Sequence, residues 1–127
     1  MSHESLHIVL VDDETDLLYI FKEVLSSSLN CKISTFSDAS IALKFIQSEK
    51  VDFVFSDIRM PVMDGVHFLE KIKETNPDIP IVVMMSGHTK YSEEDLLNRG
   101  AALFLKKPVD PSVVIDYIKN HPHNKSK

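Results

Sequence analysis

The sequence predicts an α/β domain built on a parallel sheet with helices on both faces. Two observations carry this prediction. Short apolar runs of strand length recur five times, and segments with the apolar spacing of amphipathic helices lie between them. The runs are rich in Val, Ile and Phe and do not alternate with polar residues, as is typical of strands buried on both faces. Strand and helix therefore alternate five times, in a doubly wound arrangement.

The predicted strands are short and apolar, and each is followed by a polar or turn-forming segment. In chain order they are His7–Val11, Lys32–Phe36, Asp52–Ser56, Ile79–Met85 and Ala102–Leu105.

Three apolar stripes between these strands predict amphipathic helices. They run from Leu17 to Leu25, from Ile41 to Ile46 and from Val66 to Ile72. We expect each stripe to face the sheet.

Local signals mark the ends of the last two helices. Ser92 stands before three acidic residues and is a predicted helix start, with Gly100 as its stop. Asp110–Pro111 has the pattern of an N-cap followed by a first helical residue, and Pro122 ends that helix.

Composition limits the class of protein. A chain of 127 residues is the size of one ordinary domain. The formal net charge of −5 disfavours direct nucleic-acid binding through a basic surface. Cys31 is the only cysteine, so no intramolecular disulfide forms. The N-terminal segment resembles neither a signal peptide nor a membrane span, and we expect a cytoplasmic protein that does not bind membranes.

Polar side chains stand where the predicted strands end. Asp12 and Asp13 follow the first strand, Asp57 the third, Ser86 the fourth and Lys107 the fifth. In open α/β sheets, ligands and chemistry gather beyond the carboxyl ends of the strands. This edge of the sheet is therefore the candidate site.

These residue types suit phosphoryl transfer. If the first and third strands are neighbours, Asp12, Asp13 and Asp57 converge, and a hard cation such as Mg²⁺ relieves their mutual repulsion. Lys107 supplies a positive charge for a phosphoryl oxygen and Ser86 a hydroxyl donor. A carboxylate can itself accept the phosphoryl group.

Each of these residues also has a simpler interpretation. Asp12 and Asp13 are good caps for the first helix, and Ser86 alone is a common turn residue. Phe104 is apolar enough to be only a core residue, although core and switch roles do not exclude each other.

Four motifs together resemble the response-regulator receiver domain of bacterial two-component signalling, of the single-domain chemotaxis-regulator type. They are VDDE at 11–14, SDIRMPVMDG at 56–65, MMSGH at 84–88 and FLKKP at 104–108. The resemblance implies a flavodoxin-like fold with strand order 2-1-3-4-5. It also implies a receiver domain over residues 1–120, followed by a polar tail, 121–127.

The resemblance further implies a role for each acidic residue. Asp57 matches the phosphoacceptor. Asp13 and Asp57 resemble the carboxylate ligands of Mg²⁺, with Asp12 near the metal and the backbone carbonyl of Arg59 as a further ligand.

The remaining matches concern catalysis and switching. Lys107 resembles the lysine that contacts the phosphoryl group, and its bond to Pro108 is expected to be cis. Ser86 matches the switch hydroxyl and Phe104 the aromatic switch. We hypothesise that Arg59 and His88, at the rim of the pocket, set the lifetime of the phosphoryl group. The output face implied by the family comprises Lys90, Tyr91, Glu94, Leu97, Phe104 and Lys106.

The expected function is a phosphorylation-controlled switch. A histidine kinase or phosphotransfer protein donates the phosphoryl group, and an unknown output protein responds in trans, with the chain a monomer or a phosphorylation-dependent dimer. A phosphorelay intermediate and a receiver from a hybrid kinase are alternatives, although the Met1 start disfavours the latter. A Mg²⁺-dependent aspartate phosphatase is less suited, because Arg59 stands where that class needs a general acid. A flavodoxin-like cofactor binder is a third alternative, but this sequence lacks the Ser/Thr/Gly-rich phosphate loop that such a protein needs after the first strand.

Overall fold

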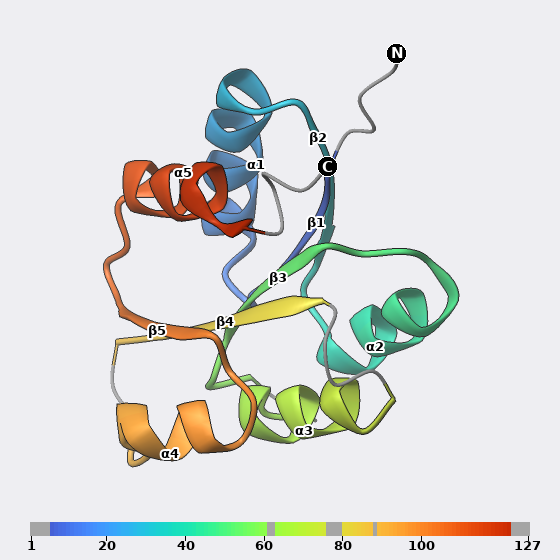
Figure 1. The fold of residues 1–127 in the computed structure, drawn as a ribbon, viewed down its shortest axis with the longest axis vertical. Coiled ribbons are helices and arrows are strands. Elements are labelled where there is room, and N and C mark those ends of the chain that lie inside the picture. The colour runs from blue at the N-terminus through green and yellow to red at the C-terminus, as the bar shows by residue number, and fades with distance from the viewer. Residues whose placement is uncertain (1–5, 61–62, 76–79, 88, 123–127) are drawn as a thin grey trace.

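A computed structural model describes residues 6–60, 63–75, 80–87 and 89–122 (Figure 1). Strands and helices alternate along the chain, as the sequence predicts. The elements are β1 (Leu6–Val11), α1 (Thr15–Ser28), β2 (Cys31–Phe36), α2 (Ala39–Ser48), β3 (Phe53–Asp57), α3 (Gly65–Thr75), β4 (Ile81–Ser86), α4 (Glu93–Asn98), β5 (Leu103–Lys106) and α5 (Pro111–Asn120).

The strands form one parallel sheet in the order β2-β1-β3-β4-β5, which confirms the predicted topology. β1 pairs with β2 on one side and β3 on the other, with Val11 opposite Phe36 and Ser56. The switch in strand order between β1 and β3 opens a crevice at their carboxyl ends.

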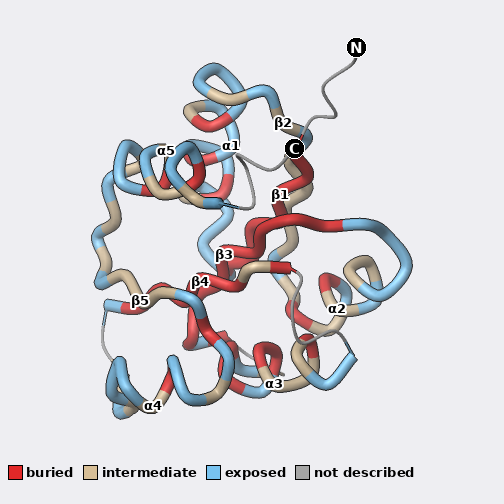
Figure 2. Tube along the Cα trace, in the orientation of Figure 1, coloured by how far each residue is buried: buried red, intermediate tan, exposed pale blue. Residues whose placement is uncertain are grey.

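Helices cover both faces of the sheet, with α1 and α5 on one side and α2, α3 and α4 on the other (Figure 1). Successive strand residues point to opposite faces, so each strand contributes side chains to the hydrophobic core on each face of the sheet. In β3, Phe53 and Phe55 pack under α1 and α5, whereas Val54 packs against α2 and α3. β1 and β3 are buried along their whole length (Figure 2). No helix in the described part of the chain is long and apolar enough to cross a membrane.

Side-chain caps begin α2, α3, α4 and α5. The residues directly before these helices each accept a hydrogen bond from a backbone N–H of the first turn; they are Asp38, Asp64, Ser92 and Asp110. Gly100 follows the last residues of α4 with a φ of 115°, a left-handed conformation that glycine adopts without strain. The predicted helix starts at Ser92 and Asp110 and the stop at Gly100 are confirmed.

Some predicted boundaries and burials are wrong. The fourth strand begins at Ile81 rather than Ile79; Ile79 lies outside the described residues, and Pro80 has no N–H to donate to a ladder. Ile20 and Ile41, which belong to the predicted stripes, are 52% and 56% exposed because they lie at the solvent side of α1 and α2. The Lys107–Pro108 peptide bond is cis, as expected.

Candidate functional site

The register of the sheet brings the polar strand ends together. Asp57 is the last residue of β3, and Ser86 is the last residue of β4. Ser86 pairs with Lys106 of β5, and the next residue, Lys107, donates its backbone N–H to Ser86 O at 2.9 Å. On the other side, Asp12 and Asp13 leave β1, the neighbour of β3. Residues far apart in the sequence therefore meet at one edge.

Three carboxylates converge at this edge. Asp12, Asp13 and Asp57 each place one carboxylate oxygen within 4.8 Å of the other two. Asp12 and Asp57 are buried, whereas Asp13 is exposed. A set of hard oxygen donors this close together fits a divalent cation such as Mg²⁺, which would offset their repulsion.

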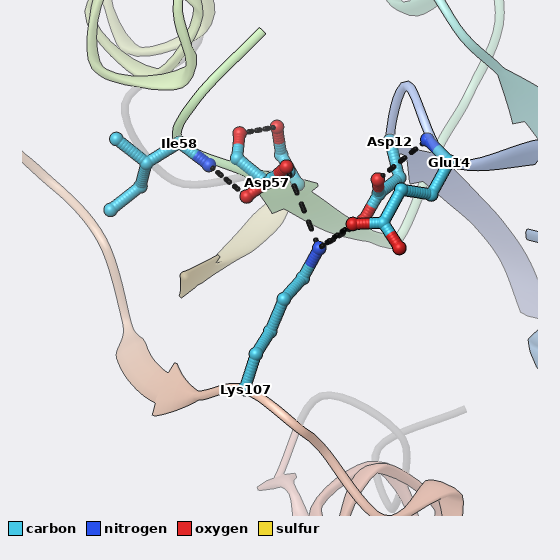
Figure 3. A network of polar contacts seen from close by, with 6 residues as sticks. Asp12, Glu14, Asp57, Ile58 and Lys107 are labelled. Atoms are coloured by element: carbon cyan, nitrogen blue, oxygen red, sulfur yellow. Dashed lines mark hydrogen bonds and ion pairs between the residues drawn. The ribbon is translucent and has the colours of Figure 1, made fainter. Parts of the chain in front are cut away.

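The ammonium group of Lys107 lies among the carboxylates (Figure 3). Its Nζ is 2.7 Å from Oδ2 of Asp12, 3.5 Å from Oδ2 of Asp57 and 3.9 Å from Oε2 of Glu14. Burial disfavours the charged amine, but the hydrogen bond to Asp12 and the nearby carboxylates outweigh it and raise the pKa of Lys107. Lys107 is therefore a fixed cation at this site.

Asp57 is held by backbone on one side and faces Lys107 on the other. Its Oδ1 accepts the N–H of Ile58 at 2.9 Å, and its backbone carbonyl accepts the hydroxyl of Ser56 at 2.9 Å. Burial raises the pKa of Asp57 above its ordinary value; the Asp12 carboxylate adds to this rise, and Lys107 opposes it. Burial therefore leaves this carboxyl group poorly solvated, and a poorly solvated carboxylate is a good nucleophile for an electrophilic centre that takes up its charge.

An open hollow adjoins the acidic cluster. It is lined from the β1, β3, β4 and β5 ends of the sheet, so a group bound there contacts the carboxylates, the amine and the buried Ser86 together. The polar and aromatic lining residues include Asp13, Glu14, Asp57, Arg59, Asp64, Ser86, Thr89, Lys90, Tyr91 and Lys107.

Gly65, the first residue of α3, packs directly on the loop after Asp57. Its N–H donates to Ile58 O at 2.7 Å. A Cβ at this position would lie 2.2 Å from Asp57 O and 2.7 Å from Ile58 Cα, and both atoms belong to the backbone. Only glycine allows α3 to approach the site this closely.

The geometry distinguishes between the interpretations of Asp12 and Asp13. The N-cap residue of α1 is Glu14, whose side chain makes no capping hydrogen bond. The Asp12 carboxylate instead accepts the N–H of Glu14 at 2.9 Å and the amine of Lys107. Among the described residues, neither Asp12 nor Asp13 is therefore the N-cap residue of α1.

The predicted switch and rim residues differ in how far the structure bears on their roles. Phe104 is half-buried and packs against the core under α2, α3 and α4, so the core interpretation holds for it in this structure. Arg59 is exposed and lines the hollow. His88 lies outside the described residues, and the roles of Arg59 O and of the Ser86 hydroxyl stay predictions.

The contacts of two residues that shape the site were not predicted from the sequence. Glu14 lies near Lys107, and the only signal for it is its position directly after two aspartates at a strand end. The close approach of Gly65 has a signal in the Asp-Gly pair that follows the loop after Asp57. Tyr91, expected only on the output face, also lines the hollow.

Comparison with known proteins gives a consistent picture. The family model described as the response regulator receiver domain matches residues 8–119. The transcriptional regulatory protein GlrR of Escherichia coli K12 is 31% identical over 118 residues, which make up 93% of this chain and 26% of GlrR. The chain therefore spans about a quarter of the length of this curated relative.

Solved structures agree over nearly the whole chain. A CheY-like response regulator receiver domain protein from Methanospirillum hungatei JF-1 superposes with a TM-score of 0.88 at 27% identity, covering 98% of this chain and 100% of that one. The beryllofluoride-activated NtrC4 receiver domain dimer superposes with a TM-score of 0.83 at 26% identity, covering 94% and 97%.

Proposed function

The chain belongs to the response-regulator receiver domain family, and from this premise we propose that Asp57 accepts a phosphoryl group from the phosphohistidine of a histidine kinase. Receiver domains act in phosphorylation-controlled signalling, interact with histidine kinases and bind Mg²⁺ at an acidic pocket. The observation that carries the proposal is the meeting of the buried Asp57 with two further aspartates and the amine of Lys107.

In the proposed transfer, a carboxylate oxygen of Asp57 attacks phosphorus. The new O–P bond forms as the N–P bond to the donor imidazole breaks, and the imidazole nitrogen keeps the electron pair. Lys107 lies close enough to Asp57 to donate a hydrogen bond to a phosphoryl oxygen. Mg²⁺, when bound by Asp12, Asp13 and Asp57, neutralises charge on the carboxylates and the incoming group.

We propose that the output depends on Ser86 and Phe104. The hydroxyl of Ser86 donates to the phosphoryl group, and Phe104, two residues before Lys106 on the adjacent strand, repacks in response. The surface that changes comprises Lys90, Tyr91, Glu94, Leu97, Phe104 and Lys106. It binds a partner protein in trans or a second copy of the chain, and the dimeric state named for NtrC4 supports the second option.

Two further parts of the proposal concern the boundaries and the rim. Residues 1–120 form the receiver unit, which is supported by the end of α5 at Asn120, and residues 121–127 form its tail. Arg59 and His88 set the phosphoryl lifetime. Lifetimes within about twofold of wild type in Arg59→Ala and His88→Ala would contradict this last part.

The proposal is tested by measuring intact mass after incubation with acetyl phosphate, with and without Mg²⁺. We expect one Mg²⁺-dependent phosphoryl adduct in the wild type and none in Asp57→Asn. Asp64→Asn is the matched control, because it makes the same chemical change at an exposed aspartate lining the same hollow and should keep the adduct. An adduct that persists in Asp57→Asn, or turnover of a generic phosphomonoester, would contradict the proposal.

A further inference from the structure

Helix α4 has few attachments to the rest of the fold. It spans six residues, Glu93–Asn98, and Leu96 is its one fully buried side chain. Leu97, the other leucine of this helix, is 42% exposed. An element with so little buried apolar surface depends strongly on its remaining contacts.

Arg99, directly after α4, makes several of those contacts. Its Nη1 lies 2.5 Å from Oε2 of Glu70 on α3, and its Nε donates to Oδ1 of Asp95 on α4 at 3.1 Å. Its guanidinium carbon lies 5.4 Å from the ring centroid of Tyr91, in the segment that precedes α4. One side chain thus joins α3, α4 and the connection between β4 and α4.

The same side chain joins two segments that start at the functional site. One leaves Asp57, turns back where Gly65 N–H donates to Ile58 O, and continues along α3 to Glu70. The other leaves Ser86, reaches Tyr91 at the hollow, and continues along α4 to Arg99. The Glu70–Arg99 pair is where the ends of the two segments meet.

We propose that the Glu70–Arg99 ion pair is a latch that opposes displacement of α4 and of the segment before it, and that the switch through Ser86 must release it. Glu70 and Arg99 are positioning residues, because neither lines the hollow. The consequence for switching rests on the proposed function, whereas the restraint on α4 does not.

The expected effect is small but measurable. The side chains of Arg99 and Glu70 are 34% and 43% exposed, and an ion pair of this exposure shifts a local equilibrium by roughly two- to fivefold. That range is enough to bias a helix with two arrangements without affecting the fold.

Amide hydrogen exchange followed by NMR tests the latch without any phosphodonor. The N–H groups of Arg99, Gly100 and Ala101 donate to carbonyls of α4 and report its opening. We expect Glu70→Gln to accelerate their exchange roughly two- to fivefold. Amides of β1 and β3 should keep their rates, which separates a local latch from a loss of global stability.

Two comparisons make the test specific. Glu74→Gln removes the same charge from α3 but breaks the pair with Lys71 on that helix, 4.0 Å apart, instead of a pair with Arg99, and should leave α4 unchanged. In an Arg99→Gln background, Glu70→Gln should add no further acceleration, because the partner is already gone. Wild-type rates in Glu70→Gln, or the same acceleration in both backgrounds, would overturn the proposal.

Exchange measured again with beryllofluoride and Mg²⁺ tests the consequence for switching. The α4 amides should accelerate in the wild type and accelerate less in Glu70→Gln, in which the latch is already released. Equal changes in both proteins would overturn the role in switching. A wild type that does not respond to beryllofluoride would instead contradict the proposed function, since the first comparison needs no phosphodonor.

Discussion

The ammonium nitrogen of Lys107 lies 2.7 Å from Oδ2 of Asp12, a residue 95 positions earlier in the chain, and 3.5 Å from Oδ2 of Asp57. Asp12 is therefore the closer of its two buried partners. Because a divalent cation would use the same carboxylates, the amine and the metal compete for negative charge at this edge of the sheet.

Removal of this amine should strengthen Mg²⁺ binding. In Lys107→Gln the carboxylates lose their internal cation, and we expect the Mg²⁺ Kd to fall by roughly three- to tenfold. Isothermal titration calorimetry measures this directly. Lys106→Gln makes the same change at an exposed neighbour and is the control. Weaker binding in Lys107→Gln would show that the lysine organises the carboxylates rather than competing with the metal.

Neutralising Asp57 should stabilise the protein. Burial raises the pKa of Asp57, so the folded state disfavours the ionised carboxylate, and stability falls as pH rises from the ordinary pKa of 3.8 to the folded one. We expect Asp57→Asn to raise Tm at pH 7 without Mg²⁺ by about 3 °C or more. The gain should disappear below pH 3.8. Calorimetry on Asp64→Asn, an exposed aspartate, should show no comparable gain at pH 7.

A methyl group at Gly65 should disturb both stability and phosphorylation. The Cβ of Gly65→Ala would lie 2.2 Å from the carbonyl oxygen of Asp57, so α3 or the loop must move. We expect a loss of about 1–3 kcal/mol in the free energy of unfolding, together with slower adduct formation at Asp57. Gly87→Ala is the control from the same hollow, because its Cβ would only touch Lys107 Cβ at 3.7 Å. Equal urea midpoints for the two variants would contradict the steric argument.

His7 should make stability depend on pH below neutrality. Burial first, and then the nearby charge of Lys32, lower the pKa of His7 from 6.5, so the folded state disfavours the imidazolium. Stability is complete above pH 6.5 and is lost as pH falls from there towards the folded pKa. The loss is limited to about 1.4 kcal/mol per pH unit, the value for one proton.

Urea unfolding at pH 7.5 and 5.5 measures the contribution of His7. His7→Gln keeps a side chain able to bond with Ser34, which lies 2.9 Å from His7 Nε2, and should lose less stability on acidification than the wild type. His67→Gln changes an exposed histidine and should behave as the wild type does. The same pH dependence in all three proteins would exclude His7 as the source.

Most of the fold could be predicted from the sequence because the central strands are buried on both faces. Buried runs such as Val82–Met85 of β4 are apolar throughout, so they are easy to recognise. The buried face of a helix is harder to predict, since an apolar residue on the solvent side, such as Ile20, can fall within the same apolar stripe as the core residues. The start of the fourth strand was placed too early because hydrophobicity alone does not register the missing N–H of Pro80.

The candidate site was predictable in its residues but not in its contacts. Polar groups at strand ends mark the edge, yet their meeting depends on β1 lying beside β3, which the resemblance implied and local patterns do not encode. The preference of Lys107 for Asp12 and the ion pair of Glu70 with Arg99 depend on side-chain positions set by packing between distant segments. No local pattern carries that information.

The position of β1 in the middle of the sheet has a consequence for synthesis on the ribosome. β1 needs both β2 and β3 as partners, but β3 ends at Asp57, much later in the chain. At ordinary translation rates this interval is about 2–9 s. Throughout it, one apolar edge of β1 has no native strand to pair with. During this interval Leu6–Val11 is an apolar segment with one unpaired edge, and a chaperone that binds extended apolar segments should bind the nascent chain there.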